Sequence, residues 1–210
     1  MKIEITSVTA RDGGGLIAIG AKISEGENLE RRELVLLASQ YSELSVRTGE
    51  IGTEEFEEIL SAAELCSAVR KGMAILGYGA YSKKELALKL RNKGVAMQTA
   101  SGAADLLAEM GYVDEQEDAA RFAERSVRKY HGKRRIASEL FSKGYPNEAV
   151  EYALGSIEEI DFSERCAEYI EKKYRNIPDT PEGRKKLFSA LARMGYTSSE
   201  IKEAFRVLTE

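Results

Sequence analysis

The strongest constraint on the fold is an internal repeat in the carboxy-terminal two thirds of the chain. Three segments of twelve residues, which begin at Lys84, Arg134 and Lys185, superimpose with offsets of 50 and then 51 residues. Each carries two apolar residues four positions apart and a glycine four positions later. Because self-similarity at such a period is typical of repeat proteins, we predict three copies of one structural unit. The shared positions are Leu86, Ile136 and Leu187; Leu90, Leu140 and Leu191; and Gly94, Gly144 and Gly195.

The repeated segment is predicted to be the middle helix of a three-helix unit. Apolar residues four positions apart lie on one helix face, and glycine readily takes the left-handed conformation that ends a helix. Helical periodicity before and after each segment adds a first and a third helix, nine in all. Capping boxes at Ser82 and Thr197, each with Glu three residues later, indicate two helix starts. We expect repeats at residues 61–113, 114–160 and 161–210, stacked into an elongated curved array with a concave binding side.

Residues 1–60 are predicted to form a separate acidic module that contains a β-hairpin. Residues 2–8 alternate in polarity, residues 12–15 (Asp-Gly-Gly-Gly) suit a turn, and residues 16–19 are apolar. Residues 34–37 suit either a further strand or a short helix. The glycine run lacks the pattern of a phosphate-binding loop, so a plain turn is the preferred interpretation. The predicted fold class is therefore mainly α, with three tandem three-helix repeats after a small β-containing module.

The charge balance differs between the two parts of the chain. Residues 1–60 hold six Lys or Arg and twelve Asp or Glu, whereas the remainder holds 25 and 23, so a net charge of -6 precedes one of +2. This balance does not by itself establish a nucleic-acid partner. No apolar run reaches the roughly 18 residues of a membrane span. The amino terminus also lacks the order of a signal peptide, so we expect a cytoplasmic protein with no membrane partner.

Few residues suit catalysis or metal binding. His131, the only histidine, is interpreted as an exposed helix-junction residue, with a phosphate contact as the functional alternative and a catalytic base as a weaker one. The acidic residues at 114–118 favour a helix start, where they stabilise the dipole, over an ion site. Cys66 and Cys166 lie far apart without ligands at metal-binding spacing, so both are predicted to be small buried helix residues. We therefore predict no enzymatic activity, no metal and no cofactor.

Basic clusters that recur in register with the repeat are the main candidates for a binding surface. They occupy the predicted first turn of each middle helix, where positive charge opposes the helix dipole, so helix stability does not explain them. A solvated charged face and a surface that meets phosphates or an acidic protein both remain open. Neutralising the second cluster is expected to weaken binding and to leave thermal stability nearly unchanged. The clusters are Lys83 and Lys84; Lys133, Arg134 and Arg135; and Arg184, Lys185 and Lys186.

A second group of basic residues stands directly before tyrosines. Cations beside aromatic rings can support stacking on nucleic-acid bases. Tyrosines near helix ends are more often packing residues whose hydroxyls stay in water, and this interpretation is preferred. The basic pairs still complete the set of candidate binding residues. They are Arg128 and Lys129 before Tyr130, and Lys172 and Lys173 before Tyr174.

Three motifs stand out in the helical part of the chain. Residues 82–94 have the pattern Ser-x-x-Glu-Leu-x-x-Lys-Leu-x-x-Lys-Gly, residues 111–115 (Gly-Tyr-Val-Asp-Glu) precede Phe122 and Ala123, and residues 139–144 have the pattern Glu-Leu-x-x-Lys-Gly. With these motifs the chain resembles the RecX family of bacterial regulators of the RecA recombinase, in which the second motif is a Gly-Tyr-Leu-Asp-Asp block and the third belongs to the second repeat. The resemblance extends from about residue 68 to residue 208. Val113 and Glu115 replace the commoner Leu and Asp of the block.

The resemblance implies a nonenzymatic protein without a cofactor that docks in the helical groove of the RecA filament on single-stranded DNA. It would limit filament extension, ATP hydrolysis, strand exchange and coprotease action, and its basic clusters would touch RecA or, weakly, single- and double-stranded DNA. An elongated shape gains affinity from several weak contacts. We expect a monomer in the free state. The alternative is an autonomous DNA-binding helical repeat protein, against which the mild charge argues.

Overall fold

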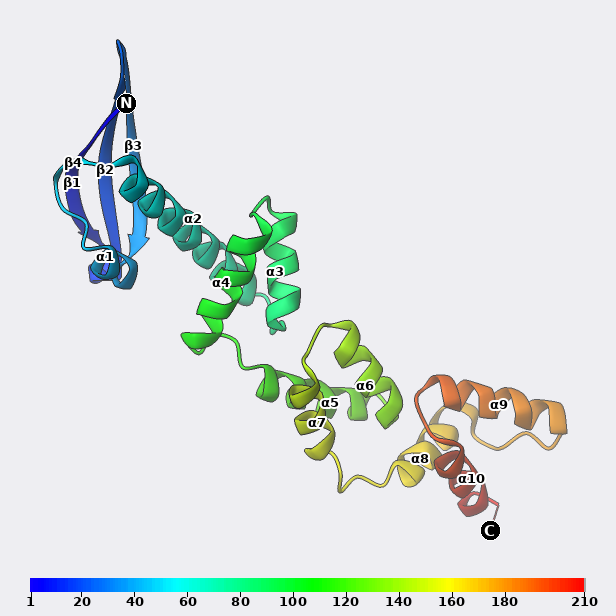
Figure 1. Ribbon diagram of the computed structural model, residues 1–210. Coiled ribbons are helices and arrows are strands. Elements are labelled where there is room, and N and C mark those ends of the chain that lie inside the picture. Colours follow the sequence, from blue (N-terminus) through cyan, green and yellow to red (C-terminus); the bar gives the residue numbers. More distant parts are fainter. Residues whose placement is uncertain (210) are drawn as a thin grey trace. The chain divides into compact units, whose positions relative to one another are not determined.

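The computed structural model describes residues 1–209 and divides into two compact units (Figure 1). The first consists of residues 1–79 and 86–112, and the second of residues 80–85 and 113–209. The first unit holds a four-stranded sheet, the helices α1 (Ala38–Leu44), α2 (Thr53–Leu76) and α4 (Met97–Glu109), and most of α3 (Lys83–Asn92). Helices α1 and α2 contact the sheet, and α4 packs on α2. The second unit is entirely helical apart from its loops.

The amino-terminal sheet is antiparallel and consists of β1 (Lys2–Arg11), β2 (Leu16–Glu25), β3 (Asn28–Leu37) and β4 (Gly49–Ile51), in the spatial order β3-β2-β1-β4. Strands β1 (Lys2–Arg11) and β2 (Leu16–Glu25) form the predicted hairpin, which turns through a short 3-10 segment, Asp12–Gly14, whose Gly13 and Gly14 have φ of +67° and +96°. Residues 34–37 belong to a strand, β3 (Asn28–Leu37), so the strand alternative is confirmed. The core face of the sheet packs against helix α2 (Thr53–Leu76) through a cluster that includes Ile3, Ile5, Ile19, Leu36, Phe56 and Ile59.

Helix α2 (Thr53–Leu76) connects the sheet to the first group of repeat helices. A short helix, α1 (Ala38–Leu44), and a short strand, β4 (Gly49–Ile51), precede it, and neither was predicted from the sequence. The predicted module boundary after residue 60 lies inside this continuous helix, and the domain limits stay a prediction. Farther along α2, a Cβ at Gly72 would lie 2.5 Å from Leu107 Cδ1, so the missing side chain lets the first-repeat helices approach closely.

The helices that follow have the predicted three-helix periodicity. Helices α3 (Lys83–Asn92), α6 (Lys133–Ser142) and α9 (Pro181–Arg193) are the middle helices, and Gly94, Gly144 and Gly195 end them with φ of +82°, +82° and +96°. The glycine stops are therefore confirmed. The outer helices are α4 (Met97–Glu109), α5 (Glu115–Arg128), α7 (Asn147–Gly155), α8 (Phe162–Tyr174) and α10 (Ser198–Val207).

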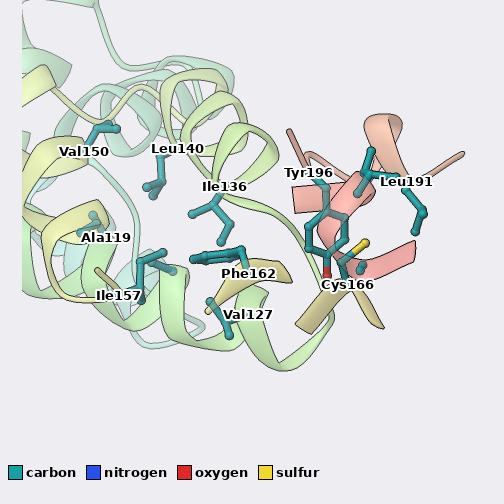
Figure 2. Close-up of a cluster of buried hydrophobic side chains, with 14 of the residues drawn as sticks. Ala119, Val127, Ile136, Leu140, Val150, Ile157, Phe162, Cys166, Leu191 and Tyr196 are labelled. Atoms are coloured by element: carbon teal, nitrogen blue, oxygen red, sulfur yellow. The ribbon is translucent and has the colours of Figure 1, made fainter. Parts of the chain in front are cut away.

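One hydrophobic core joins the second and third repeats, which both lie in the second unit (Figure 2). Phe162, at the start of α8, points toward Ile136 and Val127 of the second repeat and is 4% exposed. Tyr196 lies beside Cys166, and both side chains are almost fully buried. Burial raises the pKa of the Cys166 thiol to about 12, so this cysteine is an inert packing residue, as predicted.

The two repeats also meet through helix ends. The amide of Gly132, the N-cap residue of α6, donates to the carbonyl of Met194 at 2.8 Å, and the amide of Arg134 donates to the carbonyl of Gly195 at 3.2 Å. The first amides of a helix lack partners within the helix, and the last carbonyls lack them too. The end of α9 therefore satisfies the start of α6, and the dipoles of the two helices meet with opposite ends. We call this contact the repeat seam.

A related contact covers the start of α3 within the second unit. The hydroxyl of Ser82 accepts from the amide of Glu85 at 3.1 Å and donates to the carbonyl of Lys143 at 2.6 Å, while the amide of Lys83 donates to Glu115 Oε1 at 2.9 Å. The carbonyl next to the glycine stop of α6 therefore faces the start of α3. At the repeat seam, the end of α9 meets the start of α6 in the equivalent way.

We expect Gly132→Ala to destabilise the second unit, because a Cβ there would lie 2.4 Å from both C and O of Gly195. The φ of Gly132 is -76°, so alanine suits the backbone and the effect is steric. The expected loss is about 2 kcal/mol or more in the free energy of unfolding, of which the N-cap preference explains up to about 1 kcal/mol.

Gly155→Ala is the matched control, because Gly155 ends a helix of the same unit and a Cβ there would meet nothing within 4 Å. It should leave stability unchanged or raise it by up to about 1 kcal/mol. Urea unfolding followed by circular dichroism measures both variants. Equal stability of the two would show that the seam tolerates a methyl group and that the contact is looser than described.

Candidate functional site

The three recurring basic clusters differ in exposure because the seam contacts cover two of them. Lys83, Lys133 and Arg135 are half-buried, while Lys84 and Arg134 are exposed. The three residues of the third cluster are all exposed. This cluster also lies in the second turn of its helix, because α9 begins at Pro181, with Thr180 accepting from the amide of Gly183 at 3.1 Å. The prediction of a first-turn position was therefore wrong for the third cluster.

Arg135 is held by structural contacts and is only partly available for binding. Its Nε donates to Glu139 Oε1 at 2.7 Å, and its Nη1 lies 3.5 Å from the sulfur of Met194 across the seam. Lys133 Nζ lies 5.6 Å from the ring centroid of Phe162. Neutralising the second cluster therefore removes packing and ion-pair contacts, so the expectation of unchanged stability is replaced by one of partial destabilisation.

A compact aromatic group brings together the second set of basic residues. The ring centroids of Tyr130 and Tyr169 are 5.6 Å apart, and those of Tyr169 and Tyr174 are 6.2 Å apart. We call Tyr130, Tyr169 and Tyr174 the tyrosine cluster. The basic pairs in the sequence indicated its two helix-end members, Tyr130 and Tyr174, but not Tyr169. Helical spacing could have indicated it, because Arg165, Tyr169 and Lys173 are successive i, i+4 neighbours on one face of α8.

Three cations lie against the rings of the tyrosine cluster. The guanidinium carbon of Arg165 is 4.5 Å from the centroid of Tyr130, and Lys172 Nζ is 5.0 Å from the same centroid. Lys173 Nζ lies 5.4 Å from the centroid of Tyr169 and 5.7 Å from that of Tyr174, and it also donates to the Tyr169 hydroxyl at 2.9 Å. This bond raises the pKa of Lys173, so the amine stays charged. Arg128 and Lys129 are exposed, with Arg128 3.7 Å from Glu124.

The seam fixes the backbone at one end of the tyrosine cluster. Tyr130 has φ of +61°, a conformation that L residues adopt rarely, and its carbonyl accepts from the Tyr196 hydroxyl at 2.9 Å. Tyr196 is 1% exposed and directly follows Gly195 of the seam. Arg165 Nη2 donates to the carbonyl of Val127 at 3.1 Å, so the cation beneath the ring of Tyr130 is held in place too. The position of this ring therefore depends on the packing of the third repeat.

His131 is largely buried, which corrects the prediction of an exposed junction residue. Its side chain is 14% exposed, and Nδ1 lies 3.6 Å from Glu139 Oε2, too far for a hydrogen bond. Burial, with smaller contributions from Arg135 and Lys129, lowers the pKa of the imidazole, although Glu139 opposes the shift. A neutral histidine packed at the seam suits neither a phosphate contact nor a catalytic base facing solvent.

The acidic residues at 114–118 act at a helix start, as predicted. Asp114 is the N-cap of α5 and accepts from the amide of Glu117 at 3.1 Å, while Asp118 forms a 2.7 Å ion pair with Arg121. No group of three or more His, Cys, Asp or Glu side chains within residues 1–209 could hold a metal ion. Over the same residues, no helix is long and apolar enough to span a membrane.

Comparison with known proteins relates the chain to bacterial regulators. Residues 159–205 match the family model described as RecX, third three-helix domain. The regulatory protein RecX of Xanthomonas axonopodis pv. citri (strain 306) is 29% identical over 140 residues, which cover 66% of this chain and 85% of that protein. The regulatory protein RecX of Stenotrophomonas maltophilia (strain R551-3) is 30% identical over 143 residues, with the same two coverages. A crystal structure of a regulatory protein RecX matches 95% of this chain and 97% of that one with a TM-score of 0.71 at 17% identity, which shows a shared fold.

We expect the burial of His131 to make stability depend on pH. Because its folded pKa lies below the ordinary value of 6.5, the unfolded chain binds the proton more tightly. The contribution of His131 to stability is therefore complete above that value and is lost as the pH falls through it toward the folded pKa. Wild type should lose more thermal stability than His131→Gln when the pH is lowered from about 7.5 to about 5.5.

Thermal unfolding by circular dichroism gives the two slopes, and nuclear magnetic resonance follows the imidazole directly because the chain has one histidine. Parallel slopes for wild type and variant, or an imidazole that titrates at or above its ordinary pKa, would contradict the assignment of a buried neutral His131.

Proposed function

The chain belongs to the RecX family of nonenzymatic regulatory proteins, and we propose that it binds the RecA filament on single-stranded DNA within the helical groove of the filament. Bound there, it limits filament extension, ATP hydrolysis, strand exchange and coprotease action. The proposal rests on the match to two proteins named regulatory protein RecX. The matches extend over 140 and 143 residues and cover 85% of each of those proteins.

The distribution of exposed charge supports a contact through the third repeat. The seam contacts leave Arg184, Lys185 and Lys186 as the one recurring cluster that is wholly exposed, and Lys172 and Lys173 are exposed on the same repeat. Flexible cations on a solvated surface can meet phosphates or an acidic protein face with little desolvation cost. The remaining candidates of the first two clusters contribute through their exposed members, Lys84 and Arg134.

Repetition of one structural unit supports a binding mode with several weak contacts. The middle helices of the repeats share the same local features, because each buries two apolar residues four positions apart and ends at a glycine with positive φ. Linked weak contacts raise the overall affinity through effective concentration when the spacing of the sites matches that of the target. A filament of identical subunits is a target with regular spacing.

An autonomous DNA-binding protein is the second candidate function. The tyrosine cluster with its lysines favours it, because rings beside cations are a common way to hold single strands. The net charge of +2 over residues 61–210 opposes it, since proteins that bind naked DNA tightly are commonly much more basic.

Titration of RecA ATP hydrolysis on single-stranded DNA tests the proposal. We expect this protein to reduce hydrolysis well below one copy per RecA, because a molecule docked in the groove or at a growing end stops many subunits. The affinity for naked DNA is measured in parallel at several salt concentrations. If RecA is unaffected while binding to naked DNA is tight and falls steeply with salt, the second candidate replaces the first.

The exposed third cluster is tested by Arg184→Gln, Lys185→Gln and Lys186→Gln in one variant. These side chains are exposed, but Arg184 Nε donates to the carbonyl of Pro178 at 3.0 Å, and the variant loses this bond. We therefore expect stability to fall by less than about 1 kcal/mol while more protein is needed for half inhibition of RecA. The control variant combines Lys71→Gln, Arg91→Gln and Lys93→Gln, which remove the same charge from exposed positions outside the candidate sites. If both variants lose inhibition equally, the loss is due to the overall charge of the protein, and the third cluster is not a specific binding site.

A further inference from the structure

We propose that the tyrosine cluster, with Lys172 and Lys173, is a stacking site for the unpaired bases of single-stranded nucleic acid. The bases lie against the rings of Tyr169 and Tyr174, and the two lysines turn to the neighbouring phosphates. This inference deepens the proposed function and rests on it for the source of the strand, which is the DNA of the filament. The site itself is a property of residues 130–174 and needs no RecA to bind.

The spacing of the rings selects an unstacked strand. Ring centroids 5.6 Å and 6.2 Å apart are separated by more than the ~3.4 Å rise between stacked nucleotides. The planes are also inclined to one another, by 37° and 76°, so each ring offers its face in a different direction. Neighbouring bases of a duplex cannot reach separate rings without unstacking, whereas a flexible single strand can place one base on each.

The balance of interactions favours displacement of the lysines by bases. Lys172 and Lys173 are exposed, and a cation on a ring at such a site favours the contact by roughly two- to fivefold in the equilibrium constant. A base stacked on an aromatic side chain favours binding by roughly five- to 150-fold, and the freed ammonium group gains a phosphate partner. Arg165 stays in place, because it is partly buried and bonded to Glu168 and to the carbonyl of Val127.

Backbone strain at the edge of the cluster is a second, independent observation. The helix ends at Gly94, Gly111, Gly144 and Gly195 use glycine for positive φ, but the ends of α1, α5 and α8 use Ser45 at φ +50°, Tyr130 at φ +61° and Arg175 at φ +66°. Such residues are strained and persist where the surroundings hold them, often at functional sites. Two of these three residues, Tyr130 and Arg175, flank the same aromatic group.

An acidic protein segment is the competing ligand for this surface. It would pair with Lys172 and Lys173, but it would gain nothing from the ring faces of Tyr169 and Tyr174. The observations favour nucleic acid because the surface combines both elements, exposed cations for phosphates and, for bases, the exposed ring of Tyr174 beside the half-buried ring of Tyr169. Replacement of the rings alone, with the charges kept, therefore separates the two ligands.

The test compares Tyr169→Leu, Tyr174→Leu with Tyr169→Phe, Tyr174→Phe in the full chain. Both double variants lose the bond between Lys173 and the Tyr169 hydroxyl, but only phenylalanine keeps an aromatic face. Fluorescence anisotropy with a labelled oligothymidine and with a duplex of equal length gives the affinities. We expect the leucine pair to bind the single strand at least about tenfold more weakly, the phenylalanine pair to recover most of that loss, and duplex binding to change little.

The control Tyr78→Leu removes a tyrosine that is 90% exposed and lies outside the cluster, so it should leave single-strand affinity unchanged. If the double leucine variant folds poorly, Tyr174→Leu alone replaces it, because the Tyr174 side chain is 37% exposed. This single variant should show part of the loss in single-strand affinity. Equal affinities of the leucine and phenylalanine pairs overturn the proposal. So does a loss of binding to polyglutamate that matches the loss for the oligonucleotide, since that result indicates an acidic protein ligand.

Failure of this inference can be told apart from failure of the proposed function. If wild type inhibits RecA but the leucine pair binds oligothymidine as wild type does, the stacking site is wrong and the regulatory proposal stands. If wild type leaves RecA unaffected and the leucine and phenylalanine pairs differ as expected on oligothymidine, the stacking site stands without the filament.

Discussion

The contact between the end of α9 and the start of α6 is the interaction on which the second unit depends. Gly132 and Gly195 have no side chains, so carbonyls of one helix reach the free amides of the other, and each helix supplies what the other lacks. Tyr196 follows this contact and donates to the carbonyl of Tyr130, which holds that residue in its strained conformation. The backbone contact at the repeat seam therefore helps to position the ring of Tyr130 and, with it, the tyrosine cluster.

The same contact gives unequal roles to basic residues that look equivalent in the sequence. Covering the start of a middle helix buries part of Lys133 and Arg135 and directs Arg135 to Glu139 and Met194. At the last repeat, α9 gains an extra turn with Pro181 at its first position and Thr180 as cap, and its basic residues stay in water. Equivalent basic residues in the three repeats therefore differ in exposure because different contacts cover the starts of their helices.

Patterns within one element were sufficient to predict most of the fold. The glycine stops, the capping box at Thr197, the amino-terminal hairpin and the burial of Cys66 and Cys166 all depend on residues close in sequence, and all are present. The short helix α1 was missed because its seven residues contain too little periodicity to recognise. The family resemblance also follows from local spacing, and the relatives confirm it.

The sequence by itself determined which segments are helices, where they end and that they repeat, because those properties depend on side chains within one or two turns. Only the tertiary structure decided which charges are exposed, why His131 is buried, and that Tyr169 joins Tyr130 and Tyr174. These properties arise from contacts between residues about 40 to 60 positions apart, such as Tyr130 with Tyr169 and Arg135 with Met194. Their geometry is set by how closely two backbones can approach at Gly132 and Gly195, which no pattern along the chain records.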